Sequence, residues 1–474
     1  MTRTPAVAAL ISAGLVLTLT ASGAPAASVR AAPTPGADGI GDRYFPRDGN
    51  GGINVLEYDI HDAYAFRTGR LSGWTRLTVR ATQDLSSFNL DFLLPVSRVR
   101  VDGITAGHNR PANHELLITP AAPIEAGHKF QVRVDYAGQP GELTYAGESN
   151  WLAGPDEVVA MNEPHMAPWW FPSNDHPRDK ARMDIWLTVP QSREVIANGH
   201  RVGRTVRNGR ATVHWRPREP MATYNAFFAA GSFAVDRGVS RGLPWYVAAS
   251  RQIPTAQHGV AMDMLRRTPA IVRWLQSQLG TYPFSTTGGV VTSLNPGFSL
   301  ENQTRPVYSG LGRGSTFLMV HELAHQWLGD SVSVQSWRDI WLNEGAATFM
   351  EVRHAETHGG QSAHAWLMSR YTGTPAASSF WNLRIGDPGA ARMFDLRVYV
   401  RGAMALQALR QRVGNADFWT VLRAWVRTHR IGHGSTPQFH ALAERVSGAS
   451  LDGFFDAWFF TPAKPARTRA NGLR

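Results

Sequence analysis

The sequence predicts a multidomain α+β protein in which an N-terminal antiparallel β domain precedes a mainly helical domain. At 474 residues the chain is longer than one ordinary hydrophobic core requires, so at least two domains are expected. Apolar and polar residues alternate through much of the first half, which is typical of half-buried strands. Beyond about Asp236, apolar residues recur every three or four positions, which is typical of amphipathic helices. This change of period places the predicted domain boundary between residues 236 and 237.

The first 27 residues have the pattern of a secretory signal peptide. Arg3 precedes an apolar run from Pro5 to Ala21, and small residues follow in an A-x-A arrangement that ends at Ala26. An uncleaved membrane anchor is the alternative, but small residues rather than basic stop-transfer residues follow the run. We therefore expect a signal peptide over 1–27, a Pro/Gly/Ala linker over 28–38, and a secreted protein with no later transmembrane segment.

Strands are expected in residues 39–236, where the alternating runs are broken by Gly, Pro and Asn. The clearest runs are residues 76–103, 129–138, 181–190 and 210–219. Helices are expected where apolar residues share one helix face, and several of these segments begin at Ser or Thr and end at Gly. They are residues 255–280, 315–329, 401–414, 416–430 and 435–446.

The composition limits the kinds of site and partner that the chain can have. It contains no cysteine, so a metal site must be built from His, Asp or Glu. The net charge of +11 is partly due to a basic tail, residues 464–474, which has four positive side chains. This charge favours solubility or loose association with anionic surfaces. No interleaved basic and aromatic pattern indicates a nucleic-acid partner.

The segment HELAH carries His321 and His325 about one helical turn apart. Ser315 or Thr316 can cap the helix, and Gly329 can end it. The two histidines would then share one face and could bind a single ion. The alternative is an ordinary amphipathic helix whose histidines pack against their neighbours.

Glu344 follows the HELAH segment after a gap of eighteen residues, in a stretch that also has helical character. It can project from a second helix and complete a ligand set with His321 and His325. Three protein ligands leave a fourth position for water, as in catalytic zinc sites, and two imidazoles favour zinc over calcium or magnesium. Glu322 lies too far round the helix to join this set, but it can take a proton from a zinc-activated water. The pattern predicts a zinc metallopeptidase.

HELAH followed by Glu344 within WLNEG resembles the gluzincin metallopeptidases, and specifically the aminopeptidase N family, over nearly the whole mature chain. The resemblance implies a saddle-like β domain over 39–236 and a thermolysin-like peptidase domain over 237–463 with one Zn²⁺ per chain. It implies an aminopeptidase that hydrolyses the N-terminal residue from peptides with a free N-terminus. Longer relatives continue with a further helical domain, but this chain ends at Arg474, 130 residues after Glu344. We expect a two-domain form with a more open cleft.

A second motif carries an implied substrate contact. NPGFSLENQTRP resembles the family's G-x-M-E-N segment, which implies that Glu301 anchors the free α-amine of the substrate. Two positions depart from the motif, because Phe298 stands in place of the glycine and Leu300 in place of the methionine. The backbone contact that the family makes from that glycine is therefore not carried over.

Two further residues are implied by the same resemblance. Glu163 precedes Asp175 of the NDHP segment by twelve residues, which implies a second contact to the amine. Tyr399 begins a Y-x-x-G-A segment fifty-five residues after Glu344, which implies a hydrogen-bond donor to the developing oxyanion.

Two other functions stay open. A gluzincin endopeptidase would need an open cleft without a carboxylate pair on the N-terminal side of the substrate. A non-catalytic zinc-binding or surface-binding protein is suggested by the basic tail and by the aromatic run Trp169, Trp170 and Phe171. Trp169, Trp170 or Phe298 could instead line a specificity pocket, or they could pack in the core. Zinc binding alone does not require Glu322, so an intact base favours the enzyme.

Overall fold

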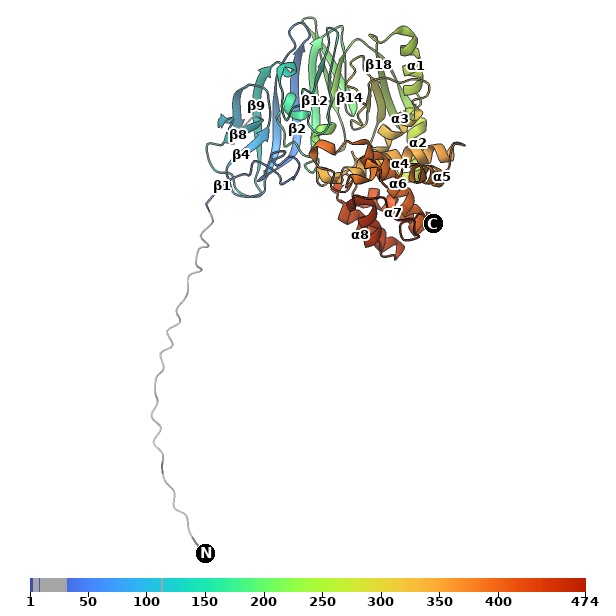
Figure 1. Ribbon diagram of the computed structural model, residues 1–474. Helices are drawn as coiled ribbons and strands as arrows, with labels where there is room; N and C mark the ends of the chain where they lie inside the picture. The colour runs from blue at the N-terminus through green and yellow to red at the C-terminus, as the bar shows by residue number, and fades with distance from the viewer. Residues whose placement is uncertain (3–7, 9–31, 112–113) are drawn as a thin grey trace. The chain divides into compact units, whose positions relative to one another are not determined.

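The computed structural model describes residues 1–2, 8, 32–111 and 114–474. The predicted signal peptide, apart from residues 1–2 and 8, and the first part of the predicted linker lie outside the described residues. Residues Pro33–Arg474 form one compact unit, coloured from blue to red in Figure 1. Among the helices described there, we find none that combines the length and the apolar character needed to cross a membrane.

An eight-stranded mixed sheet dominates the N-terminal half, with the strand order β14-β15-β12-β2-β3-β9-β5-β6. Its strands are β2 (Ile53–Ala65), β3 (Arg70–Ala81), β5 (Val96–Val101), β6 (Ile104–Thr105), β9 (Lys129–Gly138), β12 (Arg182–Pro190), β14 (His200–Arg207) and β15 (Arg210–Arg216). Neighbouring strands are antiparallel except for β2 and β12, which are parallel. Alternation predicts strands but not their direction, so the sheet expected to be antiparallel is mixed.

Two four-stranded sheets complete this half, in the orders β1-β4-β8-β7 and β10-β11-β16-β13. Their strands are β1 (Thr34–Pro35), β4 (Leu85–Asp91), β7 (Gly107–Asn109), β8 (Glu115–Thr119), β10 (Trp151–Ala153), β11 (Glu157–Ala160), β13 (Glu194–Ala197) and β16 (Phe228–Gly231). Thr34 and Pro35, within the predicted linker, therefore belong to a sheet, because β1 pairs with β4. Trp169, Trp170 and Phe171 are fully buried in the apolar core that these sheets share.

The C-terminal half begins with a sheet that the residue spacing did not predict. Its order is β17-β18-β19-β20, formed by β17 (Phe233–Ser240), β18 (Leu243–Ser250), β19 (Thr287–Val291) and β20 (Val307–Tyr308). The last five residues of β18 are all buried, so this strand does not show the alternation of a half-buried strand. Residue 236 lies inside β17, and the domain limits themselves stay a prediction.

The remaining elements are mostly helices. They are α1 (Thr255–Leu265), α2 (Thr268–Leu279), α3 (Thr316–Ala324), α4 (Trp341–Thr357), α5 (Ala363–Gly373), α6 (Leu396–Val413), α7 (Asn415–Thr428), α8 (Thr436–Ser447) and α9 (Asp452–Phe455), with the parallel strands β21 (Val332–Val334) and β22 (Gly432–Gly434). Short 3-10 helices span Pro140–Glu142, Ala167–Trp169, Thr223–Asn225, Trp337–Asp339, Ser379–Asn382 and Ala390–Arg392, and a π-helix spans Asp456–Phe460. The predicted helix 255–280 is two helices, because Pro269 sits in the first turn of α2 rather than in a helix interior.

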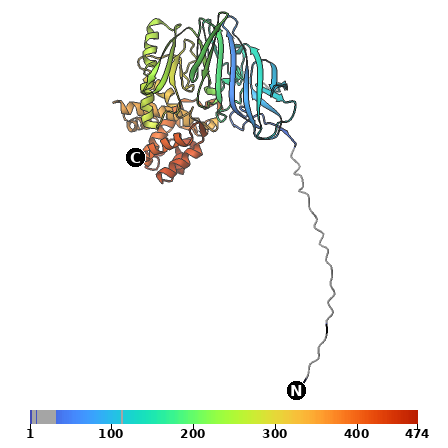
Figure 2. The ribbon, with the colours of Figure 1, turned by 180° about the vertical axis from the view of Figure 1, so that it is seen from behind.

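Helices α4 and α6 cross at two glycines. A Cβ atom at Gly345 would lie 2.8 Å from the Cα of Gly402, and one at Gly402 would lie 2.7 Å from the Cα of Gly345. Only glycine permits this approach, which brings the start of α4 next to the start of α6. In Figures 1 and 2 the helices α4 to α8 gather on one side of Pro33–Arg474, away from β4, β8 and β9.

The predicted basic tail is folded against the helices rather than free. Trp458 Nε1 donates to the backbone oxygen of Asn471 at 3.1 Å, and Tyr371 donates to the backbone oxygen of Pro465 at 2.8 Å. Leu473 is buried in the helical core. Only some basic side chains of the segment, such as Arg467 and Arg469, remain exposed.

Candidate active site

Helix α3 presents the HELAH segment to the interior. Ser315 is the N-cap residue, but its side chain accepts a hydrogen bond from Gly312 N at 3.0 Å instead of capping the helix. His325 is the C-cap residue and keeps helical dihedral angles, with φ −57° and ψ −25°. Gly329 ends the following turn with a φ of 149°, in the region that favours glycine. The two histidines, His321 and His325, therefore lie one turn apart, with ring centroids 4.8 Å from each other.

Glu344, in the first turn of α4, meets both histidines. Its Oε2 atom lies 3.3 Å from His321 Nε2 and 3.4 Å from His325 Nε2. Ligands about 2.0–2.2 Å from a tetrahedral zinc ion are separated from one another by roughly the same distance, near 3.3 Å. Two imidazole nitrogens and one carboxylate oxygen are also the donor types that zinc prefers. The three residues therefore fit a zinc ion.

The second nitrogen of each imidazole is held by a hydrogen-bond partner. His321 Nδ1 lies 2.7 Å from Glu351 Oε1, and His325 Nδ1 lies 3.0 Å from the backbone oxygen of Leu328. Such partners orient the ring and direct the other nitrogen at the ion. Glu351 was not predicted from the sequence, although it lies seven residues after Glu344, about two turns along the same helix face.

Electrostatics around these residues favour a bound cation. Burial opposes ionisation of Glu344, but the two histidines hold its pKa down at about 2. Burial alone would lower the pKa of His325, but the negative charges of Glu344 and Glu301 outweigh burial and raise this pKa to about 9. The carboxylates therefore attract positive charge to the position that a metal ion would occupy.

Glu322 lines the same cavity but is not part of the His321, His325, Glu344 group. Burial, with repulsion from Glu301 and Glu344, raises the pKa of Glu322 to about 8, against the attraction of the two histidines. A carboxyl group with a pKa near neutrality can both accept and return a proton, which suits a general base that later acts as an acid.

Glu163 and Glu301 converge beside the donor set. One carboxylate oxygen each of Glu163, Glu301 and Glu344 lies within 4.8 Å of the others. Glu163 Oε1 and Glu301 Oε1 are buried and have no hydrogen-bond partner in the part of the chain that the structure describes. Burial, together with repulsion between them, raises the pKa of Glu163 well above its usual range.

Backbone pairing fixes the position of Glu301. The preceding residue, Leu300, exchanges two backbone hydrogen bonds with Val307 of β20, at 2.9 and 2.8 Å. Gln326, next to His325, donates to the backbone oxygen of Glu301 at 2.8 Å. The segment is thereby tied both to the sheet and to the HELAH turn.

Tyr399, near the start of α6, is half-buried at the edge of the cavity. Its ring lies nearly parallel to that of His321, with centroids 6.0 Å apart. Burial and the charge of Glu344 raise the pKa of the phenol well above its usual range, so it keeps its proton and can donate a hydrogen bond.

All seven of the predicted site residues line one cavity of about 490 Å³. Its apolar wall includes the exposed aromatic rings of Phe298, Phe317 and Phe394. Of the three aromatic residues considered for a specificity pocket, Phe298 lines this cavity, whereas Trp169 and Trp170 are buried in the core of the N-terminal half.

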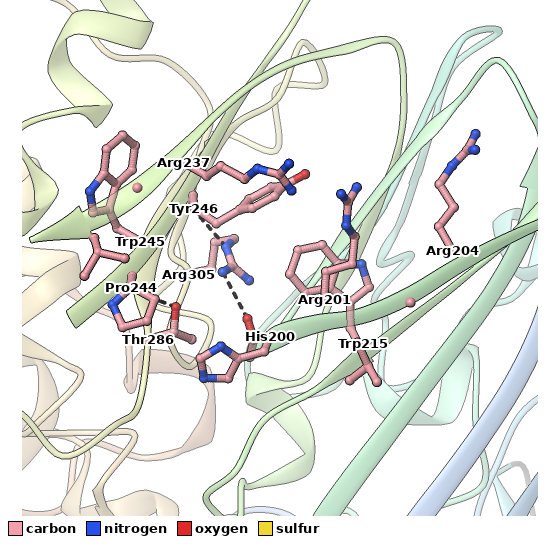
Figure 3. Close-up of a pocket in the computed structure, with 15 residues that line it drawn as sticks. His200, Arg201, Arg204, Trp215, Arg237, Pro244, Trp245, Tyr246, Thr286 and Arg305 are labelled. Carbon is pink, nitrogen blue, oxygen red and sulfur yellow. Dashed lines mark hydrogen bonds between the residues drawn. The ribbon is translucent and has the colours of Figure 1, made fainter. Parts of the chain in front are cut away.

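A larger cavity, of about 650 Å³, lies between β14 and the hairpin of β17 and β18 (Figure 3). Figure 3 shows Arg305 between Tyr246 and Trp215, where it donates to the backbone oxygens of Tyr246 and Gly199 at 3.1 Å. The 15 lining residues include four arginines but no aspartate or glutamate. The cavity therefore offers neither a carboxylate base nor a His/carboxylate metal site.

Comparison with known proteins matches two family models to the chain. The Peptidase M1 N-terminal domain matches residues 82–225, and the Peptidase family M1 domain matches residues 312–458. Mouse endoplasmic reticulum aminopeptidase 1 is 28% identical over 260 residues, which is 51% of this chain and 28% of that protein. The leucyl aminopeptidase of Saccharolobus solfataricus is 23% identical over 314 residues, 63% of this chain and 38% of that protein. The chain thus spans less than half the length of these relatives.

Solved structures of similar size match over nearly the full length. A mutant of an M1 zinc metallopeptidase from Deinococcus radiodurans, bound to a Tyr-Ser-Ala substrate, has a TM-score of 0.79 at 28% identity and covers 91% of this chain and 100% of its own. A two-domain M1 zinc metallopeptidase mutant bound to L-tryptophan has a TM-score of 0.80 at 28% identity, covering 90% and 100%. These matches imply a zinc cofactor. The chain belongs to the M1 family of zinc metallopeptidases, in a form with a β-rich N-terminal domain and a helical catalytic domain.

Proposed function

We propose that this chain is a zinc aminopeptidase that removes the N-terminal residue from peptides with a free amino terminus. The observation that carries the proposal is the pair Glu163 and Glu301 beside the His/Glu donor set, where one buried oxygen of each carboxyl group has no hydrogen-bond partner among the described residues. A protonated α-amine placed between them would pair with both carboxyl groups and offset one negative charge. A peptide bound by its middle offers no such cation and would leave the carboxylates desolvated and unpaired.

His321, His325 and Glu344 would hold the zinc ion, which supplies Lewis-acid polarisation of the scissile carbonyl and a lowered pKa for water. Glu322 removes the proton from the attacking water and delivers it to the amine that leaves. Burial raises the pKa of its carboxyl group, so the carboxylate form is a stronger base than that of an exposed glutamate. Glu163 and Glu301 hold the α-amine, so that the first peptide bond is the one presented to Glu322.

Stepwise shortening of a peptide tests this proposal against endopeptidase activity. We expect mass spectrometry of a digested ten-residue peptide to show products that lose residues one at a time from the N-terminus, because only the amino end carries the cation that the carboxylate pair needs. Internal fragments as the first products would favour the endopeptidase. A zinc-loaded protein that leaves every peptide intact would favour a non-catalytic binding protein.

Tyr399→Phe should lower kcat by about 10²–10³-fold, the effect of removing one donor to a developing oxyanion. The zinc content should not change, because Tyr399 is outside the donor set. KM should change little, since the phenol would act on the transition state rather than on the bound substrate. Steady-state kinetics together with metal analysis would check this, and a phenylalanine variant with full kcat would remove Tyr399 from the mechanism.

Secretion is part of the proposal because residues 1–27 have the signal-peptide pattern. We expect the mature protein to be recovered from the medium of its host, with an N-terminus at about Ser28. N-terminal sequencing would check this, and a protein that stays in the cell with its first residues intact would contradict it. The exposed arginines near the C-terminus would allow only loose attachment to anionic surfaces.

A further inference from the structure

A second buried cluster of metal-ligating side chains lies in the N-terminal half, outside the candidate active site. It consists of Asp48, Asp91, His114 and Glu115, which we call the Asp91 cluster. Each of these residues is at most 2% exposed. Asp91 ends β4 and Glu115 begins β8, and the two are directly opposite each other in the antiparallel pair. Like charges in such positions repel, so something must offset the repulsion.

The oxygens of this cluster surround one nitrogen atom, Nε2 of His114. Asp91 Oδ1 and the backbone oxygen of Arg47 lie 3.2 Å from it, as does the hydroxyl of Tyr145. Glu115 Oε1 lies at 3.7 Å and Asp48 Oδ1 at 3.9 Å. A single N–H can donate to only one or two of these oxygens.

Several of these atoms have no hydrogen-bond partner. Both carboxylate oxygens of Glu115 and Asp91 Oδ1 are buried and unpartnered within the described residues. In contrast, Asp91 Oδ2 accepts from Asp175 N at 2.6 Å and from Asn50 Nδ2 at 3.1 Å. Asp91 is thus anchored through Oδ2, and its Oδ1 faces His114 Nε2 at 3.2 Å. Unpaired carboxylate oxygens at this depth are costly unless a cation lies among them.

The charges of the cluster balance around a divalent ion. Asp48 is already matched, because its Oδ2 lies 2.6 Å from His165 Nε2. Asp91 and Glu115 then contribute two negative charges, and a neutral His114 can offer the lone pair of Nε2. One divalent cation neutralises the two carboxylates without a further partner.

The spacing also agrees with metal ligation. One donor atom each of Asp91, His114 and Glu115 lies within 4.8 Å of the others, as is true of His321, His325 and Glu344. The nitrogen-to-oxygen distances of 3.2 and 3.7 Å resemble the 3.3 and 3.4 Å of that set. We propose that Asp91, His114 and Glu115 bind a second divalent transition-metal ion, such as Zn²⁺ or Mn²⁺, that joins the end of β4 to the start of β8. The imidazole favours these ions over calcium or magnesium.

Counting metal ions in matched variants tests the proposal. The protein is incubated separately with ZnCl₂ and with MnCl₂, and unbound ions are removed by gel filtration. The bound metal is then measured by inductively coupled plasma mass spectrometry. With at least one of the two metals we expect about two ions per wild-type chain, about one in His325→Ala, about one in Glu115→Gln, and almost none in the double variant. Glu444→Gln is the control, because its carboxylate belongs to a more exposed trio with His440 and Asp452 and should leave the count unchanged.

The His325→Ala variant decides the question even if Glu115→Gln fails to fold. Retention of about one ion by His325→Ala, lost on addition of a chelator together with a fall in Tm, would support the site. The proposal would be overturned if His325→Ala held no ion after incubation with ZnCl₂ and none after incubation with MnCl₂. It would also be overturned if a folded Glu115→Gln variant held as many ions as the wild type. Peptidase activity is not measured, so the outcome does not depend on the proposed function.

Discussion

Glu322→Gln is expected to lower kcat by about 10²–10⁴-fold while the zinc content stays at the wild-type level. Glutamine keeps the size of the side chain but cannot accept the proton of the attacking water. The His321, His325, Glu344 donor set does not include Glu322, so zinc should remain bound. The measurement is the kinetics of one aminoacyl anilide combined with metal analysis of the same sample.

His325→Ala is the control for this experiment, because it should lose the zinc of the active site and the activity together. A Glu322→Gln variant that loses zinc would identify Glu322 as a ligand. A variant that keeps both zinc and full kcat would show that another group is the base.

Glu301→Gln is expected to reduce kcat/KM for a peptide with a free N-terminus by about 10²-fold or more, because it removes one of two buried carboxylates that would pair with the α-amine. The N-acetylated form of the same peptide should be affected far less, since it carries no cation to lose. The ratio of kcat/KM for the free peptide to kcat/KM for the N-acetylated peptide should therefore fall. Glu163→Gln should lower this ratio as well.

Glu356→Gln offers a matched control for these variants. Glu356 is on α4 like Glu344, but it pairs with Arg353 and Arg410 and does not line the cavity. Its replacement should leave the ratio unchanged. An unchanged ratio in both Glu301→Gln and Glu163→Gln would exclude these residues as the amine anchors, even with aminopeptidase activity intact.

Residue spacing along one helix was enough to predict the part of the site whose residues are close together in the sequence. His321 and His325 are four residues apart, so their meeting follows from helix geometry alone. The wider constellation could not be derived in this way, because Glu301 is placed by the pairing of Leu300 with Val307, and Glu163 lies in the segment after β11, far from the histidines in sequence. Only the resemblance of short motifs to a known family nominated them.

Features that depend on tertiary packing could not be predicted from the sequence. Glu351 supports His321 across a helix interface, and no pattern marks that contact except its place two turns after Glu344. The crossing of α4 and α6 depends on Gly345 and Gly402, which lie 57 positions apart and look like ordinary helix residues in the sequence. The strand β18 was missed because it is buried along its last five residues, so its side chains do not alternate between apolar and polar.

The spacing of charged residues gave no sign of the Asp91 cluster either. Asp91 and Glu115 become neighbours only through the register of β4 and β8. Isolated acidic residues in strands are ordinarily exposed, so their burial here could be recognised only from the structure.

The central claim, that recognition of a free α-amine determines where the chain is cut, is tested most directly by one paired assay of the zinc-loaded wild-type protein. The same short peptide is offered free and N-acetylated, and kcat/KM is measured for the bond after its first residue. If Glu163 and Glu301 bind the α-amine, the free peptide should be cleaved faster by at least about 10²-fold, because only it supplies a cation that can pair with their unpartnered oxygens. Equal rates for the two forms would contradict the aminopeptidase proposal and leave an endopeptidase that does not use these carboxylates.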